Sequence, residues 1–133
     1  MTYYAVIDTN GFILQDMSTT TSATYLCSEN AFGEQFFEIE KAELIQTELG
    51  TYVDVYYSNE KGEDPEDGLS FRIVDQTGEA YESTGGSGVI CVENGLYRQR
   101  CMLNKCEIGE TLYVEAFDCW GKEVYGVIEL SRE

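Results

Sequence analysis

The segment Thr51–Ser58 reads Thr-Tyr-Val-Asp-Val-Tyr-Tyr-Ser and is the clearest structural signal in the chain. Threonine, tyrosine and valine favour β-strands, and successive side chains of a strand point to opposite faces. The segment would therefore place two valines and a tyrosine on one face, and two tyrosines and Asp54 on the other. It predicts a strand that buries one face in the core of a β-rich domain.

Working outward from this strand, the chain repeats the same pattern between turn signals. Leu69–Asp75 alternates between apolar and polar residues, and Val89–Glu93 is a short apolar run that we expect to be a buried strand. Further strands are predicted at Leu96–Leu103, Thr111–Phe117 and Val124–Leu130. Eight to ten short strands at near-regular spacing predict an all-β fold, or a mainly β fold with one short helix. The expected architecture is an antiparallel β-sandwich, Ig-like or barrel-like.

The beginning of the chain also carries a strong turn signal. Two β-rich runs flank Asn10-Gly11, and this arrangement predicts a hairpin at residues 3–16. A chain of 133 residues is long enough for one domain with a real core. We therefore predict a single β-rich domain, residues 1–133, in which the hairpin is added to a sandwich at about residues 36–133.

Three segments between the predicted strands are harder to assign. The Ser/Thr-rich residues 17–23 and the Gly-rich residues 83–88 are typical of loops. Residues 28–48 fit either a helix or a strand, because Ser28-Glu29-Asn30 is able to cap a helix while the following alternation suits a strand. We favour a strand beginning at Phe36.

Charge restricts the function more than any other feature. The chain has 25 acidic residues, 8 basic residues and no histidine, which gives a net charge of −17. Nucleic acids and anionic membranes are bound through cationic patches, so we expect neither as a direct partner. The missing histidine removes the commonest general base and metal ligand. We therefore predict a protein that is not an enzyme and that uses no cofactor.

The five cysteines suggest free thiols in a reducing compartment. Their number is odd, we expect no signal peptide, and no Cys-x-x-Cys pair occurs. A zinc site is the alternative, but we favour small apolar side chains on strand faces. We also interpret the acidic residues 59–68 as a solvated turn rather than a calcium loop. The chain shows no membrane span, and we expect it in the cytoplasm, that of the host cell if it is phage-encoded.

One stretch resembles a known family. Residues 109–122 read Gly-Glu-Thr-Leu-Tyr-Val-Glu-Ala-Phe-Asp-Cys-Trp-Gly-Lys. This resembles the last hairpin of bacterial Ig-like domains, which often reads Tyr-x-Val-x-Ala-x-Asp before a Gly-containing turn and a Val-rich strand. The resemblance implies a sandwich over residues 40–133 and a role in adhesion or scaffolding. Trp120 falls in the turn and not at the buried strand position that antibody-type domains use.

In size, charge and lack of a signal, the chain is similar to phage inhibitors of bacterial defence systems (anti-CRISPR proteins) and to toxin-immunity proteins. This class-level similarity implies carboxylates placed where phosphates would sit. We predict a non-enzymatic acidic protein that blocks a basic surface of a protein partner, such as a nucleic-acid-processing enzyme. The predicted contact residues are Glu34, Glu38, Glu40, Glu60, Glu63, Asp64, Glu66 and Asp67.

A second function is kept open. The chain would then be an Ig-like structural or adhesion module of a phage virion or of a cell-surface assembly, and its charge would serve solubility only. A homo-oligomer is expected in that case. High salt separates the two functions, because it weakens complexes held together by opposite charges.

Overall fold

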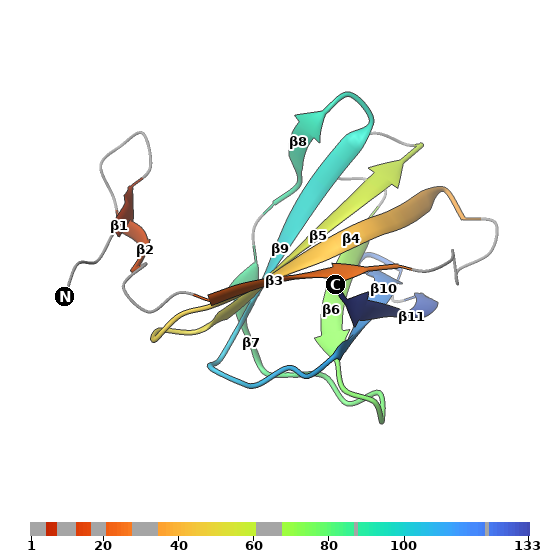
Figure 1. The fold of residues 1–133 in the computed structure, drawn as a ribbon. Helices are drawn as coiled ribbons and strands as arrows, with labels where there is room; N and C mark the ends of the chain where they lie inside the picture. The colour runs from red at the N-terminus through yellow and green to blue at the C-terminus, as the bar shows by residue number, and fades with distance from the viewer. Residues whose placement is uncertain are drawn as a thin grey trace.

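A computed structural model describes residues 5–7, 13–16, 21–27, 35–60, 68–86, 88–121 and 123–133. These residues form antiparallel strands and no helix (Figure 1). The strands are β1 (Ala5–Ile7), β2 (Ile13–Asp16), β3 (Thr21–Leu26), β4 (Phe37–Gln46), β5 (Thr51–Asn59), β6 (Leu69–Val74), β7 (Ser83–Gly86), β8 (Ile90–Glu93), β9 (Leu96–Leu103), β10 (Thr111–Asp118) and β11 (Val124–Arg132). The expectation of an all-β antiparallel protein is confirmed.

The strands form two sheets of very different size. β1 and β2 pair with each other, with a register irregularity after Val6. The other nine strands make one sheet in the order β6-β10-β11-β3-β4-β5-β9-β7, and β8 also pairs with β9. The Asn-Gly turn predicted between the first two strands lies outside the described residues.

The large sheet curls until its two ends face each other, as in a half-barrel (Figure 1). The edge strand β6 comes to lie against β9, which stands near the other end of the strand order. Gln99 Nε2 on β9 donates to the carbonyl oxygen of Leu69 at 2.8 Å, and Cys101 Sγ donates to that of Phe71 at 3.4 Å. Side chains from β9 thus satisfy backbone oxygens at the free edge of β6, as buried carbonyls require.

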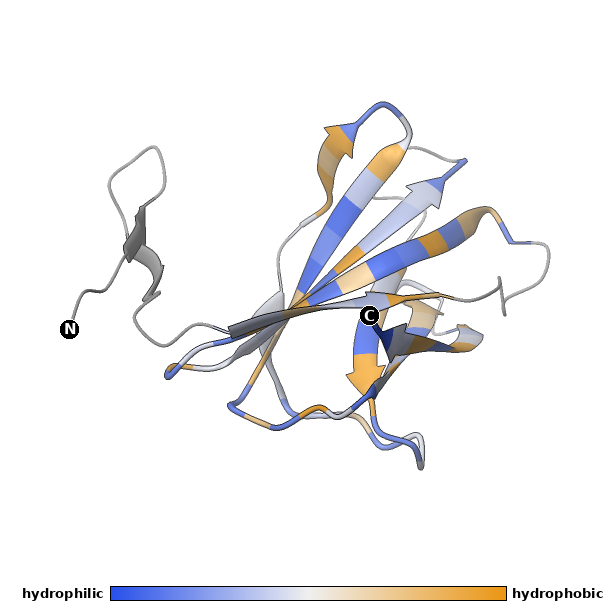
Figure 2. Ribbon diagram, in the orientation of Figure 1, coloured by the Kyte–Doolittle hydropathy of each residue, from blue (hydrophilic) through white to orange (hydrophobic). Residues whose placement is uncertain are grey.

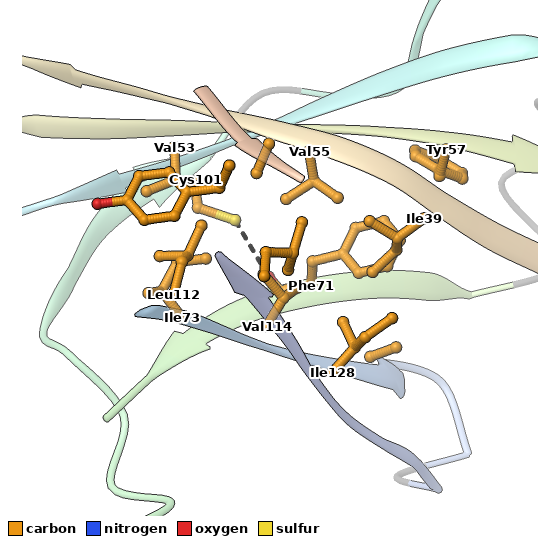
Figure 3. Packing of buried hydrophobic residues seen from close by; sticks show 14 of the residues in the cluster. Ile39, Val53, Val55, Tyr57, Phe71, Ile73, Cys101, Leu112, Val114 and Ile128 are labelled. Atoms are coloured by element: carbon orange, nitrogen blue, oxygen red, sulfur yellow. Dashed lines mark hydrogen bonds between the residues drawn. The ribbon is translucent and has the colours of Figure 1, made fainter. Parts of the chain in front are cut away.

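The core fills the inside of this curl (Figure 3). The odd-numbered residues of β5 point inward, as their alternation predicted, and Val53, Val55 and Tyr57 are fully buried. Across the core the ring of Phe71 lies edge-on to that of Tyr57, with 4.9 Å between the ring centroids. Burial of a Val, Leu, Ile or Phe side chain contributes roughly 1.5–3 kcal/mol, so the inner face of the sheet supplies the main driving force for folding.

The doubtful segment after Phe36 is a strand, as we favoured. Figure 2 shows apolar and polar bands alternating along β4. A bulge between Ile39 and Lys41 shifts the alternation by one residue, so that Ile39 and Ala42 both point into the core. The helix cap considered at residues 28–30 lies outside the described residues.

Two segments interpreted as loops are strands in the structure. β3 starts inside the Ser/Thr-rich segment and pairs with β4 over its whole length. β7 lies in the Gly-rich segment and pairs with the second half of β9. The Gly-rich segment has little strand preference of its own, and both segments lack a clear apolar alternation; each becomes a strand because a neighbouring strand offers backbone partners. Tertiary context of this kind regularly overrides propensity in sheets.

The burial expected for β8 is wrong. All four residues of this strand are exposed, because β8 pairs only with the first residues of β9, at the end of the sheet. A short apolar run indicates a strand but does not say what covers it.

Candidate functional site

The best candidate for a binding surface is the outer face of β4, β5 and β9. We use "outer face" for the side of these strands that points away from the core. It carries the even-numbered residues of β5 and the residues of β4 and β9 that pair with them. The middle rows place Glu43, Asp54 and Arg100 side by side on three neighbouring strands. Adjacent strands lie about 4.8 Å apart, so these side chains are within contact distance.

Asp54 and Arg100 form the central ion pair of this face. Arg100 Nε donates to Asp54 Oδ1 at 2.7 Å and Nη2 donates to Oδ2 at 3.0 Å. The side chain of Asp54 is only 3% exposed although it points outward. The guanidinium also lies over the ring of Tyr52, 5.3 Å from its centroid. The hydrogen bonds from Arg100 to Asp54 raise the pKa of the guanidinium, so Arg100 keeps its positive charge.

A second, more exposed pair lies beside the first. Lys41 Nζ is 3.5 Å from Glu43 Oε1 and 4.9 Å from the centroid of the Tyr56 ring. The Tyr56 hydroxyl donates to Glu43 Oε2 at 3.3 Å. Burial, followed by the charge of Glu43, raises the pKa of the Tyr56 hydroxyl. Both carboxylates in the middle of the outer face, Glu43 and Asp54, are therefore paired with a base, while Arg98 beside Tyr56 forms no ion pair with a described acid.

The charges at the end of the same strands differ from those in the middle. Glu38 and Glu40 are exposed near the start of β4, and Glu38 lies opposite Ser58 on β5. The exposed Glu60 follows β5, and its backbone N–H donates to the carbonyl oxygen of Phe36. Among the described residues no Lys or Arg forms an ion pair with any of these three carboxylates. We call Glu38, Glu40 and Glu60 the acidic end.

The structure places only part of the predicted contact set. Glu38, Glu40 and Glu60 lie together at one end of the β4–β5 pair. The others, Glu34, Glu63, Asp64, Glu66 and Asp67, lie outside the described residues. Further exposed acids occur on other elements, among them Glu93, Glu107 and Glu129. The negative charge of the described surface is therefore not confined to the first half of the chain.

Sequence reasoning missed an exposed apolar strand at the same end of the large sheet, two strands beyond β5. Val89, Ile90 and Val92 are 37%, 42% and 46% exposed on or next to β8. The pairing connects this strand to the acidic end, because Glu38, Ser58, Leu96 and Glu93 follow one another across β4, β5, β9 and β8. The apolar run at 89–92 was visible in the sequence, but its exposure was not.

The cysteines offer no metal site in the described part of the chain. None of the five is in a disulfide, and Cys101 is buried among the core residues. Burial raises the pKa of its thiol to about 12. No group of three or more Cys, Asp or Glu side chains in the described residues is arranged to hold a metal ion. The described residues also contain no helix with the length and apolarity needed to cross a bilayer.

A hollow of about 510 Å³ lies at the opposite end of β4 and β5, around the turn that joins them. Its wall includes Gln46, Thr51 and Cys106. The side chains of Gln46 and Thr51 both donate to the carbonyl oxygen of Cys106. These polar groups thus hold the loop of Cys106 in place, and the hollow is a weaker candidate for binding than the acidic end.

In comparisons with known proteins, no family model, curated protein or solved structure matches this chain.

Proposed function

We propose that this chain is an acidic, non-enzymatic binding protein that covers a basic surface of a partner protein. The supporting observation is the contrast within one sheet face. The carboxylates in the middle of the outer face, Glu43 and Asp54, are each paired with a base, whereas the three carboxylates of the acidic end have no ion-pair partner in the described residues. Carboxylates in this state keep their full attraction for an external cation.

The net charge of −17 strengthens this attraction over a longer range. A strongly negative protein accelerates encounter with a positive surface, and the rate falls as salt screens the charges. The positive surface of a nucleic-acid-processing enzyme, built to receive phosphates, has the matching chemistry. The proposed action is therefore inhibition by occupying a phosphate-binding surface, in a bacterial or phage setting.

The test compares two variants with the same change in charge. The first, Glu38→Gln/Glu40→Gln/Glu60→Gln, neutralises the acidic end. The second, Glu48→Gln/Glu107→Gln/Glu110→Gln, neutralises three exposed carboxylates outside it. Wild type and both variants are immobilised, incubated with bacterial lysate at low and high salt, and their bound proteins are identified by mass spectrometry.

We expect the wild type and the second variant to capture the same nucleic-acid enzyme at low salt, and the first variant to lose it. All three should lose it at high salt. Equal capture by both variants would contradict a role for the acidic end. Salt-independent self-association without a partner would favour the structural module instead.

A further inference from the structure

The turn between β8 and β9 places an asparagine–glycine pair at the surface. Glu93 pairs with Leu96, so only Asn94 and Gly95 form the turn. Asn-Gly is a preferred sequence for two-residue hairpin turns, and Gly95 has a left-handed φ of +82°, which glycine adopts without steric cost. Both residues are exposed, and no atom beyond the chain neighbours lies within 4 Å of the position that a Cβ on Gly95 would occupy. The backbone at Gly95 is therefore open to close approach.

The amide groups of this turn are not held by hydrogen bonds. Among the described residues, the side-chain amide of Asn94 has no partner, and the backbone N–H of Gly95 donates to no carbonyl oxygen. In the described part of the chain β8 pairs only with β9, and all four of its residues are exposed. A segment with so few buried contacts opens locally at low free energy. The side chain of Asn94 is therefore able to turn toward the nitrogen of Gly95.

Asn59 lies in the opposite environment. It is only 9% exposed, at the end of β5. The nitrogen that follows it, that of Glu60, donates to the carbonyl oxygen of Phe36 at 2.8 Å. This hydrogen bond has to break before the Glu60 nitrogen can react with a side chain.

Asn104 differs from Asn94 in the residue that follows it. Asn104 is exposed, but Lys105 comes next, and its side chain crowds the nitrogen that would attack. The dipeptide Asn10-Gly11 occurs near the beginning of the chain and lies outside the described residues. Of the described asparagines, Asn94 alone combines exposure, a following glycine and a nitrogen without a hydrogen bond.

The geometry points to Asn94 as the site of spontaneous deamidation in the described part of the chain. The backbone nitrogen of Gly95 attacks the side-chain carbonyl carbon of Asn94, and the new C–N bond closes a cyclic imide. The side-chain nitrogen leaves as ammonia, with the proton of the Gly95 amide. Water, the only co-reactant, then opens the imide. Opening at the side-chain carbonyl gives an aspartyl residue, and opening at the backbone carbonyl gives an isoaspartyl residue, in which the chain runs through the former side chain.

The two products have different consequences for the hairpin. Both replace a neutral amide by a carboxylate next to Glu93. The isoaspartyl product also lengthens the backbone of the turn by a methylene group. Because the turn fixes the register of a hairpin, this product should release β8, while β9 keeps its pairs with β5 and β7. The inference needs no partner and is independent of the proposed function.

The test incubates the full chain in mildly alkaline buffer, folded and in urea, and follows each asparagine by peptide mapping. In the folded protein we expect Asn94 to lose its amide at least about tenfold faster than Asn59 and Asn104. Urea should accelerate the reaction at Asn59 more than at Asn94, because unfolding frees the nitrogen of Glu60. If Asn94 stays intact in the folded protein, or reacts no faster than Asn59 or Asn104, the assignment is overturned.

Two variants of the same position complete the test. Asn94→Gly removes the amide and leaves Gly-Gly, which also suits the turn. Hydroxylamine cleaves a chain at such an imide, so it should cut incubated wild type between residues 94 and 95 and leave this variant intact there. Cleavage of both at this bond would contradict the proposed chemistry.

Asn94→Asp supplies the charge of the products without the longer backbone. Amide hydrogen exchange of Ile90–Glu93 in this variant should match that of wild type. The purified isoaspartyl form should exchange these amides about tenfold or more faster, because β8 is released. Equal exchange in all three forms would overturn the release of β8.

Discussion

The middle and the end of the β4–β5–β9 face carry similar residue types but differ in how their charges are used. In the middle, Arg100 holds the nearly buried Asp54 with two hydrogen bonds. At the end, the exposed carboxylates Glu38, Glu40 and Glu60 have no ion-pair partner among the described residues. The comparison teaches that charge density alone does not mark a binding surface. The charges that matter for a partner are those that the fold itself leaves unmatched.

The largest contrast concerns the thiols of Cys91 and Cys101. Cys91 is exposed on β8, and Cys101 is buried on β9 with a pKa of about 12. Since the thiolate is the reactive form, roughly one Cys101 thiol in ten thousand is ionised at pH 8. We expect iodoacetamide to modify Cys91 at least about a thousandfold faster in the folded protein. Peptide mapping after timed labelling measures the two modification rates. Unfolding the protein in urea should remove the difference between them. Similar rates in the folded protein would contradict the burial of Cys101.

The next largest effect is the loss of the central ion pair. Arg100→Met leaves the carboxylate of Asp54 buried without its cation, which should lower the free energy of unfolding by about 3 kcal/mol. Urea denaturation measures the change. The double variant Asp54→Leu/Arg100→Met removes both charges and should recover most of the loss. A double variant as unstable as the single one would show that packing, rather than charge, is responsible.

A smaller effect is expected at high pH. Burial raises the pKa of the Cys101 thiol in the folded state from its usual 9.0 to about 12, so folding favours the protonated thiol. Its contribution is complete below pH 9 and is lost as the pH rises toward 12, by about 1 kcal/mol at pH 10. We measure the free energy of unfolding by urea denaturation at pH 8 and at pH 10. The decrease between the two pH values should be smaller for Cys101→Val than for wild type. Equal losses would mean that other groups, such as tyrosines, account for the whole effect.

Breaking the exposed ion pair should have little effect. The side chains of Lys41 and Glu43 are 39% and 35% exposed, so solvent screens their attraction. We expect Lys41→Met to change the free energy of unfolding by less than about 0.5 kcal/mol. The same denaturation assay applies. A loss comparable to that of Arg100→Met would mean that the two pairs form one cooperative network.

The smallest effect on stability is expected at the acidic end. Glu38→Gln/Glu40→Gln/Glu60→Gln removes exposed carboxylates that have no ion-pair partner in the described residues. Stability should stay within about 0.5 kcal/mol of wild type, with any change toward higher stability because mutual repulsion decreases. Thermal denaturation measures it. A clear destabilisation would show that these residues support the fold and would weaken their assignment as a binding surface.

Several elements of this fold follow from local sequence rules. β5 and β10 alternate between apolar and polar residues because one face of each is buried, and that physical cause leaves a period of two in the sequence. The bulge after Ile39 interrupts this period in β4. β3 and β7 lack the pattern, because their strand state depends on pairing with β4 and β9.

The candidate site was predictable only in part. The surplus of acids pointed to Glu38, Glu40 and Glu60, and the structure brings these three to one end of a strand pair. No local rule predicted that Asp54 would find Arg100, 46 residues away in the chain. The exposure of β8 was missed for a related reason, because an apolar run looks the same in the sequence whether it is exposed or buried.

By itself, the sequence determined the strand-forming segments, the net negative charge and the lack of histidine chemistry, since all of these are properties of residue types and their spacing. The tertiary structure decided which acids are matched by bases, which thiol is buried and which apolar strand faces water. Those properties depend on which distant segments become neighbours. The curl of the sheet sets these neighbours, because it places β6 against β9 and leaves β8 at an edge.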